Sequence, residues 1–155
     1  MKKLLMATAA TALMAGAASA QDVKLGILFG YTGPIESLTG NMTAGAELAM
    51  NEISDSGLFM DGAKVTSAKG DSTCIDSAAA TAAAERLITA EGVMGIVGGD
   101  CSGVTGAVLQ NVARPNGIVM ISPSATSPAL TTAEDDGLFF RTSPSDAREG
   151  EVMAD

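Results

Sequence analysis

Histidine is absent from this chain of 155 residues, and so is tryptophan. Without histidine, the segment cannot supply a Ser-His-Asp triad, a Cys-His pair or a histidine-ligated metal site. Ser102 has no evident base in its neighbourhood that could turn its hydroxyl into a nucleophile. We therefore expect a protein that is not an enzyme and that needs neither a metal ion nor a cofactor.

Aromatic and basic residues are scarce as well. Tyr31 and four phenylalanines are the whole aromatic content, and nine basic residues stand against 18 acidic ones. Loss of a leader that carries Lys2 and Lys3 would leave seven basic residues against the same 18, a net charge of −11. A surface of this sign repels nucleic acid and anionic lipid head groups. We expect no nucleic-acid partner and no direct insertion into a membrane.

The first 20 residues have the pattern of a secretory signal peptide. A positively charged start precedes an apolar stretch over residues 4–17, and a small-x-small cleavage site at residues 18–20 precedes Gln21. The apolar stretch is shorter than the roughly 20 residues of a spanning helix. We expect cleavage after residue 20, a mature chain of residues 21–155, and a location in the periplasm.

Two cysteines are present, Cys74 and Cys101. An even number in an exported chain favours a disulfide between them. The alternatives are a metal site, which lacks histidine and a second cysteine pair, and a reactive thiol, which lacks a neighbouring base. The bridge would tie two strand ends together beside Ser102.

Strand and helix patterns alternate along the mature chain. The predicted strands are residues 23–29, 65–68, 93–97, 118–121 and 138–142. The predicted helices are residues 41–54, residues 76–90, a segment from Ser102 to a stop at Pro115, and one that opens near Ser145. The short apolar strands VMGIV and IVMI are typical of burial on both faces. The alternation predicts an α/β fold, a parallel sheet flanked by helices on both faces.

Two of these helices carry an apolar stripe at helical spacing, which predicts the face that each one buries. In the first helix the stripe consists of Met42, Ala46, Ala49 and Ile53. In the second it consists of Ala80, Ala84, Leu87 and Ile88. The small side chains of the second stripe favour close packing on the sheet.

Two polar segments follow directly on predicted strands, residues 100–103 (DCSG) and residues 122–128 (SPSATSP). In open parallel sheets, ligands bind beyond the carboxyl ends of the strands, where a hydroxyl and a backbone N–H at a helix start can hold a carboxylate. Ser102 and Thr126 are therefore candidate ligand residues. For either one alone, a helix N-cap at Ser102 or a turn brace at Thr126 is the alternative. Residues 98–103 contain glycine but match neither the dinucleotide-binding fingerprint nor the phosphate-binding loop with its lysine.

From Val23 to its end the chain resembles the periplasmic substrate-binding proteins of branched-chain amino acid ABC transporters, the Leu/Ile/Val-binding type. Several features carry the resemblance: Thr32-Gly33-Pro34 after the first strand, Ala44-Gly45-Ala46 in the first helix, the two cysteines with the adjoining serine, and above all residues 121–131 (ISPSATSPALT). It implies two α/β lobes that close on a ligand. The helical pattern still running at Asp155 suggests a chain truncated before the second lobe is complete.

The resemblance also implies a ligand site. An amino acid carboxylate would meet the N–H and hydroxyl of Ser102 and the N–H of Thr126. The ammonium would meet the carbonyl of Ser124 and the hydroxyl of Thr126, with Ala125 between them, and an acidic residue of the second lobe. Weaker candidates are Tyr31, Leu38, which stands where Leu/Ile/Val binders have an aromatic residue, and Asp100, which stands where they have an apolar one.

The function implied is that of the solute-binding component of an ABC importer, with an amino acid as ligand and a membrane permease as partner. Departures at Leu38 and Asp100 leave open related ligands such as amides, other amino acids or aromatic acids. One alternative is an extracellular ligand-sensing domain of a receptor or regulator, which a membrane span after the second lobe would favour. Another is an exported enzyme whose catalytic residues lie outside this segment.

Overall fold

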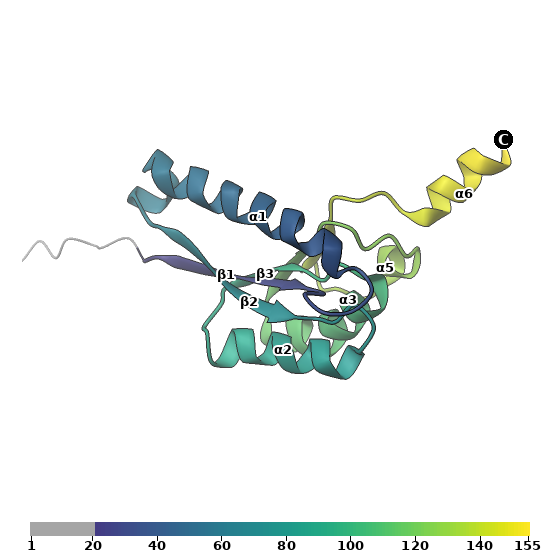
Figure 1. Cartoon of the computed structure of the whole chain (residues 1–155), viewed down its shortest axis with the longest axis horizontal. Coiled ribbons are helices and arrows are strands. Elements are labelled where there is room, and N and C mark those ends of the chain that lie inside the picture. Colours follow the sequence, from purple (N-terminus) through teal and green to yellow (C-terminus); the bar gives the residue numbers. More distant parts are fainter. Residues whose placement is uncertain (1–20) are drawn as a thin grey trace, which may run out of the picture.

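Five parallel strands form a single sheet in the order β2-β1-β3-β4-β5 (Figure 1). The computed structural model describes residues 21–155, and the predicted leader lies outside the described residues. The strands are β1 (Val23–Phe29), β2 (Val65–Asp71), β3 (Gly95–Gly98), β4 (Val119–Ser122) and β5 (Phe139–Arg141). Because β1 pairs with both β2 and β3, the strand order reverses there, and such a reversal opens a crevice at the carboxyl ends of the strands.

Helices cover both faces of the sheet, as the sequence predicts. The helical segments are α1 (Glu36–Ser56), η1 (Phe59–Asp61), α2 (Ser77–Thr89), α3 (Ser102–Val108), η2 (Leu109–Ala113), α4 (Arg114–Asn116), α5 (Ala129–Thr132) and α6 (Asp146–Ala154). Helix α1 lies on one face, while α2 and α3 lie on the other (Figure 1). The larger apolar core lies between the sheet and α2, α3 and η2, and a smaller one lies under α1.

Strand β1 contributes apolar side chains to both cores. Side chains alternate between the two faces of a strand. Accordingly Ile27 and Phe29 pack under α1, whereas Leu28 packs under α2 and α3. All three are at most 1% exposed. The predicted strand of residues 23–29 is confirmed.

Helix α2 also follows the sequence prediction. The Asp76 carboxylate accepts the N–H groups of Ala78 and Ala79, an N-cap that starts the helix. Within the predicted stripe Ala80, Ala84 and Leu87 are completely buried. The stripe packs closely on the sheet at Gly70: a β-carbon there would lie 3.0 Å from Leu87 Cδ1, a contact that Leu87 would have to shift to relieve.

Helix α1 differs from its prediction in length and in orientation. It begins at Glu36 instead of residue 41, and its buried residues are Thr39, Thr43, Met50 and Ser54. Polar residues occupy this face because the structure bonds them: Thr43 Oγ1 lies 2.8 Å from the Tyr31 hydroxyl, and Ser54 Oγ accepts the Val65 N–H at 2.8 Å. In the predicted apolar stripe, Ala49 and Ile53 remain exposed.

The helix that starts at Ser102 passes through Pro115 instead of stopping there. The run α3-η2-α4 continues without a break to Asn116 and ends at Gly117, whose φ of 65° is left-handed. Around the proline the hydrogen bonds change to five-residue spacing, with the Arg114 N–H donating to the Leu109 carbonyl. The Asn116 side chain also donates to the Val112 carbonyl at 2.8 Å. The missing N–H of proline is thus accommodated.

Strand β4 is buried on one face only, which corrects the expectation of burial on both. Met120 is completely buried, but Val119 is 38% exposed and Ile121 43%. Phe140 of the neighbouring β5 is 55% exposed. The reason is that α1 packs against β1 and β2 and leaves the corresponding face of β4 and β5 uncovered.

Candidate functional site

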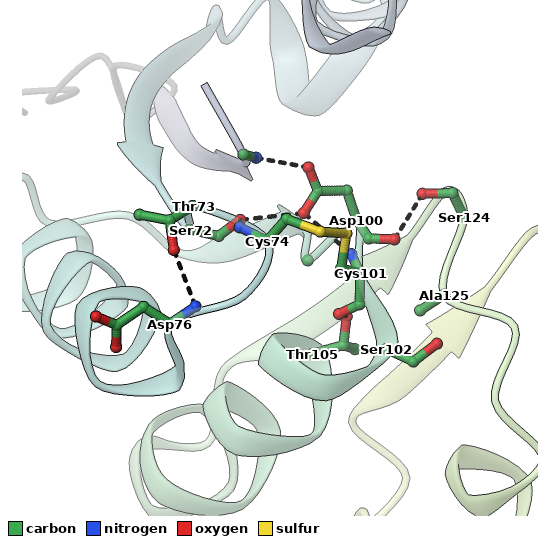
Figure 2. Close-up of a disulfide and its surroundings, with 12 residues drawn as sticks. Ser72, Thr73, Cys74, Asp76, Asp100, Cys101, Ser102, Thr105, Ser124 and Ala125 are labelled. Carbon is green, nitrogen blue, oxygen red and sulfur yellow. Dashed lines mark hydrogen bonds between the residues drawn. A yellow bond between two sulfur atoms is a disulfide. The ribbon is translucent and has the colours of Figure 1, made fainter. Parts of the chain in front are cut away.

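The loops after β1, β2, β3 and β4 meet at one edge of the sheet, around Asp100. This carboxylate is 3% exposed. One oxygen accepts the Gly30 N–H at 2.5 Å, and the other accepts the Ser72 hydroxyl and the Cys101 N–H, each at 3.0 Å. The Asp100 carbonyl accepts the Ser124 hydroxyl at 2.8 Å. Asp100 is therefore directed into the protein, where it joins the ends of three strands to the loop after the fourth (Figure 2).

A disulfide between Cys74 and Cys101 lies beside this carboxylate, which confirms the predicted pairing (Figure 2). The Cα atoms are 5.2 Å apart. Cys74 and Thr73 both have left-handed φ angles, 70° and 55°, in the sharp turn that brings the thiol to the end of β3. The bridge ties the loop after β2 to Cys101, the residue directly before α3, and so restrains the start of that helix.

Ser102 is the first residue of α3, and its side chain links two segments of the site. Ser102 Oγ accepts the N–H groups of Thr126 and Ser127, both at 3.1 Å. The N-cap position is held by Cys101, whose side chain makes no cap bond. The alternative reading of Ser102 as an N-cap therefore does not hold. With both acceptor positions used, the Ser102 hydroxyl proton is left as a donor.

The other predicted residues of the loop after β4 divide between core and surface. Ser122 Oγ donates to the Gly99 carbonyl at 2.5 Å and accepts the Ala125 N–H at 3.0 Å, which folds the loop back over β3. The Ala125 side chain is completely buried. Its carbonyl accepts bonds from Arg141 and Ser143. Ala125 can therefore only bound a site from below, whereas Ser124 and Thr126 lie at its surface.

Thr126 contacts the segment that leads into α6. Its hydroxyl donates to Asp146 Oδ2 at 3.0 Å, and its carbonyl accepts the Asp146 N–H, also at 3.0 Å. The alternative for Thr126 was a side chain that braces its own turn. In the structure its hydroxyl bonds instead to Asp146, on a different segment. Sequence reasoning missed Asp146 as a neighbour of the site, because 20 positions separate it from Thr126.

Tyr31 and Leu38 lie near the same edge of the sheet, on the segment from the end of β1 into α1. The Tyr31 ring lies 6.4 Å from that of Phe29 and its hydroxyl is bonded to Thr43. Burial raises the pKa of the Tyr31 hydroxyl, although the bond to Thr43 and the charge of Lys69 oppose that change. Leu38 is 57% exposed on the first turns of α1. Neither side chain contacts Ser102 or Thr126 through a hydrogen bond.

A second carboxylate, Asp71, holds the loop after β1 and was not singled out from the sequence. It accepts the Thr32 hydroxyl at 2.6 Å and the Thr73 N–H at 2.8 Å. Partial burial alone would raise the pKa of Asp71, but these bonds together hold it below its usual value. An aspartate at a strand end, two positions before Thr73, was the available signal, because such residues bond to their own backbone two positions on.

Among residues 21–155, no group of three or more His, Cys, Asp or Glu side chains could hold a metal ion. No helix in this range is long and apolar enough to cross a membrane.

The sequence matches known proteins over nearly its whole length. Residues 22–155 match the family model described as periplasmic binding protein. "Leu/Ile/Val-binding protein homolog 7" of Brucella melitensis is 35% identical over 147 residues, which are 93% of this chain and 35% of that protein. The Leu/Ile/Val-binding protein of Escherichia coli is 30% identical over 152 residues, 98% of this chain and 40% of that one. The chain thus spans well under half the length of these relatives.

Solved structures show the same fold. LivJ of Streptococcus pneumoniae, in complex with isoleucine, superposes with a TM-score of 0.72 at 31% identity, over 81% of this chain and 35% of that one. A solute-binding protein of an ABC transporter from R. palustris, in complex with benzoate, has a TM-score of 0.72 at 29% identity, over 84% of this chain and 35% of that one.

The family consists of proteins that bind solutes and are not enzymes, in agreement with the lack of a catalytic constellation in the sequence. The parallel sheet confirms the predicted α/β fold, and the disulfide confirms the pairing predicted from the even number of cysteines. The serine- and threonine-bearing loops after β3 and β4 meet at one edge of the sheet. The chain belongs to the periplasmic binding protein family and is similar to its Leu/Ile/Val-binding members.

Proposed function

We propose that residues 21–155 form the first lobe of a solute-binding protein that captures an amino acid, branched-chain or related, for an ABC importer. The observation that supports this most directly is the bonding of Thr126 and Ser127 to Ser102 Oγ. It joins the start of a helix to a loop that carries further hydroxyl and carbonyl groups. The two polar segments lie beyond the carboxyl ends of the adjacent parallel strands β3 and β4, where open sheets bind small ligands, and together they offer donors and acceptors to a zwitterion.

The ligand carboxylate would lie at the start of α3. The N–H groups in the first turn of a helix lack partners within the helix, and the helix dipole favours negative charge there. The Ser102 hydroxyl can donate its proton to the same carboxylate, and a charge-assisted bond of this kind contributes about 1.5–3 kcal/mol. The Thr126 N–H, expected to meet the carboxylate as well, donates to Ser102 in this structure. That bond would be shared or exchanged when the ligand binds.

The ligand ammonium would lie over the loop after β4. Among residues 21–155, no donor contacts the Ser124 carbonyl oxygen, which leaves both of its lone pairs for a ligand. The Thr126 hydroxyl oxygen is the second acceptor on this loop. An acidic residue of the second lobe would complete the ammonium site when the two lobes close. Tyr31 and Leu38 would bound the pocket for the apolar side chain of the ligand from the side. The Asp100 side chain, which is directed into the protein, would bound that pocket from below.

Export and delivery complete the proposal. The leader pattern of residues 1–20 supports secretion into the periplasm, where the mature protein would hand its ligand to a membrane permease. The names of the relatives support a branched-chain amino acid, since LivJ is bound to isoleucine. The benzoate complex of the R. palustris protein supports an aromatic acid as the competing ligand class.

Isothermal titration of the full-length mature protein tests the ligand class. L-leucine, L-isoleucine, L-valine and benzoate are titrated separately. We expect saturation with at least one of the three amino acids, without turnover, and none or much weaker binding of benzoate. Saturation with benzoate alone would contradict an amino acid ligand. A membrane span encoded after the second lobe would favour a sensor domain over a free transport protein.

A further inference from the structure

Arg141 binds the segment after β4 through three hydrogen bonds. It is the last residue of β5 and is paired with Ser122, the last residue of β4. Its Nη1 donates to the carbonyls of Ala125 at 3.2 Å and Ser127 at 2.9 Å, and its Nη2 donates to Thr131 Oγ1 at 2.6 Å. Because the guanidinium carries its donors in a rigid planar fork, one side chain fixes three points of this segment.

The positive charge of Arg141 is not neutralised by any carboxylate among residues 21–155. No ion pair in this range includes Arg141, and its side chain bonds there only to neutral oxygens. Arg114, by contrast, is paired with Asp136 at 2.9 Å and Glu134 at 3.6 Å. Charged groups that are partly withdrawn from water, as Arg141 is, are normally paired. Its charge therefore acts on the loop that it binds.

The peptide between Ala125 and Thr126 connects Arg141 to the start of α3. This peptide is trans, so its C=O and N–H point in opposite directions. The carbonyl accepts from Arg141, while the Thr126 N–H donates to Ser102 Oγ at 3.1 Å. Hydrogen bonds in such a chain polarise one another. The cation thus strengthens the Thr126 N–H as a donor on the side of Ser102.

The same guanidinium fixes the second N–H that faces Ser102. The Ser127 N–H donates to Ser102 Oγ at 3.1 Å, and the Ser127 carbonyl accepts from Arg141. The carbonyls before and after Thr126 are therefore both fixed to Arg141, and the N–H groups of Thr126 and Ser127 are directed to Ser102. An anion beside Ser102 would meet these donors and would be attracted by the charge behind them.

From this geometry we propose that Arg141 is a positioning residue for the ligand carboxylate, which favours ligands with a free carboxylate over the corresponding amides. It acts through the peptides on either side of Thr126 and through its charge, and it makes no bond to the ligand. The inference rests on the proposed function, since it concerns the carboxylate end of the same site.

The test uses the full-length mature protein and two probes, L-leucine and L-leucinamide, which keeps the ammonium but has no carboxylate. L-isoleucine or L-valine with its own amide replaces this pair if that amino acid binds more tightly. Arg141→Gln removes the charge and keeps one donor group. We expect it to weaken binding of the amino acid about tenfold, and binding of the amide, measured by displacement, less than about threefold.

Arg114→Gln is the matched control. Arg114 is also a partly buried arginine of this lobe, but its partners are Asp136, Glu134 and Gln110, none of which belongs to the site. Its replacement should change the affinity for neither probe.

Arg141→Lys separates the charge from the fork and needs only the amino acid as probe. Lysine keeps the charge but cannot reproduce the planar fork. This variant should therefore bind the amino acid several-fold more tightly than Arg141→Gln, whereas a merely structural fork predicts equal losses because both variants lack it. If Arg141→Gln does not fold, Arg141→Lys should still show the wild-type preference for the amino acid over the amide, and loss of that preference would overturn the inference.

Three other outcomes would overturn the inference and leave the proposed function intact. They are equal losses for the amino acid and the amide in Arg141→Gln, equal amino acid affinities of the glutamine and lysine variants, and an amino acid affinity that Arg141→Gln leaves unchanged. A wild-type protein that binds none of L-leucine, L-isoleucine and L-valine would overturn both the inference and the proposed function.

Discussion

The carboxylate of Asp100 accepts the backbone N–H of Gly30 at 2.5 Å, across 70 positions of sequence. The same side chain binds the Ser72 hydroxyl. Since Gly30 follows β1, Ser72 follows β2 and Asp100 follows β3, a single buried side chain joins the ends of three neighbouring strands. The position of Ser102, two residues further on, depends on that junction.

Asp100→Asn should destabilise the protein by about 2–3 kcal/mol, because an amide nitrogen would face a backbone or hydroxyl donor at one of the two oxygen positions. Urea denaturation of both proteins measures the difference in the free energy of unfolding. Asp76→Asn is the matched control: asparagine caps a helix about as well as aspartate, so its cost should stay within a few tenths of a kcal/mol. Equal losses in the two variants would contradict the junction.

The disulfide should contribute about 3–4 kcal/mol to the stability of the exported protein, since it closes a loop of 27 residues. Replacing Cys74 and Cys101 together by serine and comparing urea midpoints measures this contribution. Mass measurement after alkylation without reductant should find no free thiol in protein taken from the periplasm. Two labelled thiols would contradict the pairing.

Ser102→Ala and Thr126→Ala should each weaken amino acid binding by the full-length protein about tenfold or more, roughly 1–3 kcal/mol. Each substitution removes a protein hydroxyl that would bond to the ligand. Ser102→Ala also leaves two N–H groups without the oxygen to which they now donate. Ser127→Ala is the control, since that hydroxyl only accepts the Ala129 N–H. If titration calorimetry finds unchanged affinity in both variants, these residues have only a structural role.

Asp71 should contribute to the free energy of unfolding at neutral pH, and this contribution should be lost in acid. The pKa of its carboxyl is lower in the folded protein than the usual value of about 3.9 in the unfolded chain, so the unfolded chain binds more protons at low pH. The contribution is complete above about pH 5 and is lost as the pH falls through the folded pKa. The difference in unfolding free energy between wild type and Asp71→Asn should therefore shrink below about pH 4. A constant difference down to pH 2 would contradict this.

Residues 21–155, produced alone, should associate and should bind an amino acid no better than about millimolar, because one lobe leaves the ligand solvated. The uncovered face of β4 and β5 exposes Val119, Ile121 and Phe140 side by side, and such patches drive association. Ile121→Thr with Phe140→Ser should lower the apparent mass in light scattering at high concentration. Leu58 is 87% exposed and lies outside the uncovered face of β4 and β5, so Leu58→Ser serves as the control and should leave the apparent mass unchanged. Micromolar affinity of a monomeric fragment would contradict the two-lobe mechanism.

The order of elements could be read from the sequence because it depends on local patterns. β1 and α2 have apolar spacing, turns and caps that require no knowledge of distant residues, and both were predicted closely. The buried face of α1 could not be read in the same way. Thr43 and Ser54 are buried because Tyr31 and Val65 supply their hydrogen bonds, and these partners are known only once the chain is folded.

The sequence by itself determined the α/β class, the pairing of the two cysteines and the two polar loops that hold Ser102 and Thr126, because strand periodicity, cysteine count and strand-end position are properties of short segments. Only the tertiary structure decided that Asp100 is directed inward to Gly30 and Ser72, that Ser102 bonds across to the Thr126 loop, and that Asp146 meets Thr126. The physical reason is that a polar side chain satisfies its hydrogen bonds with whichever donors the packed strand ends bring near it, and sequence distance does not limit that choice.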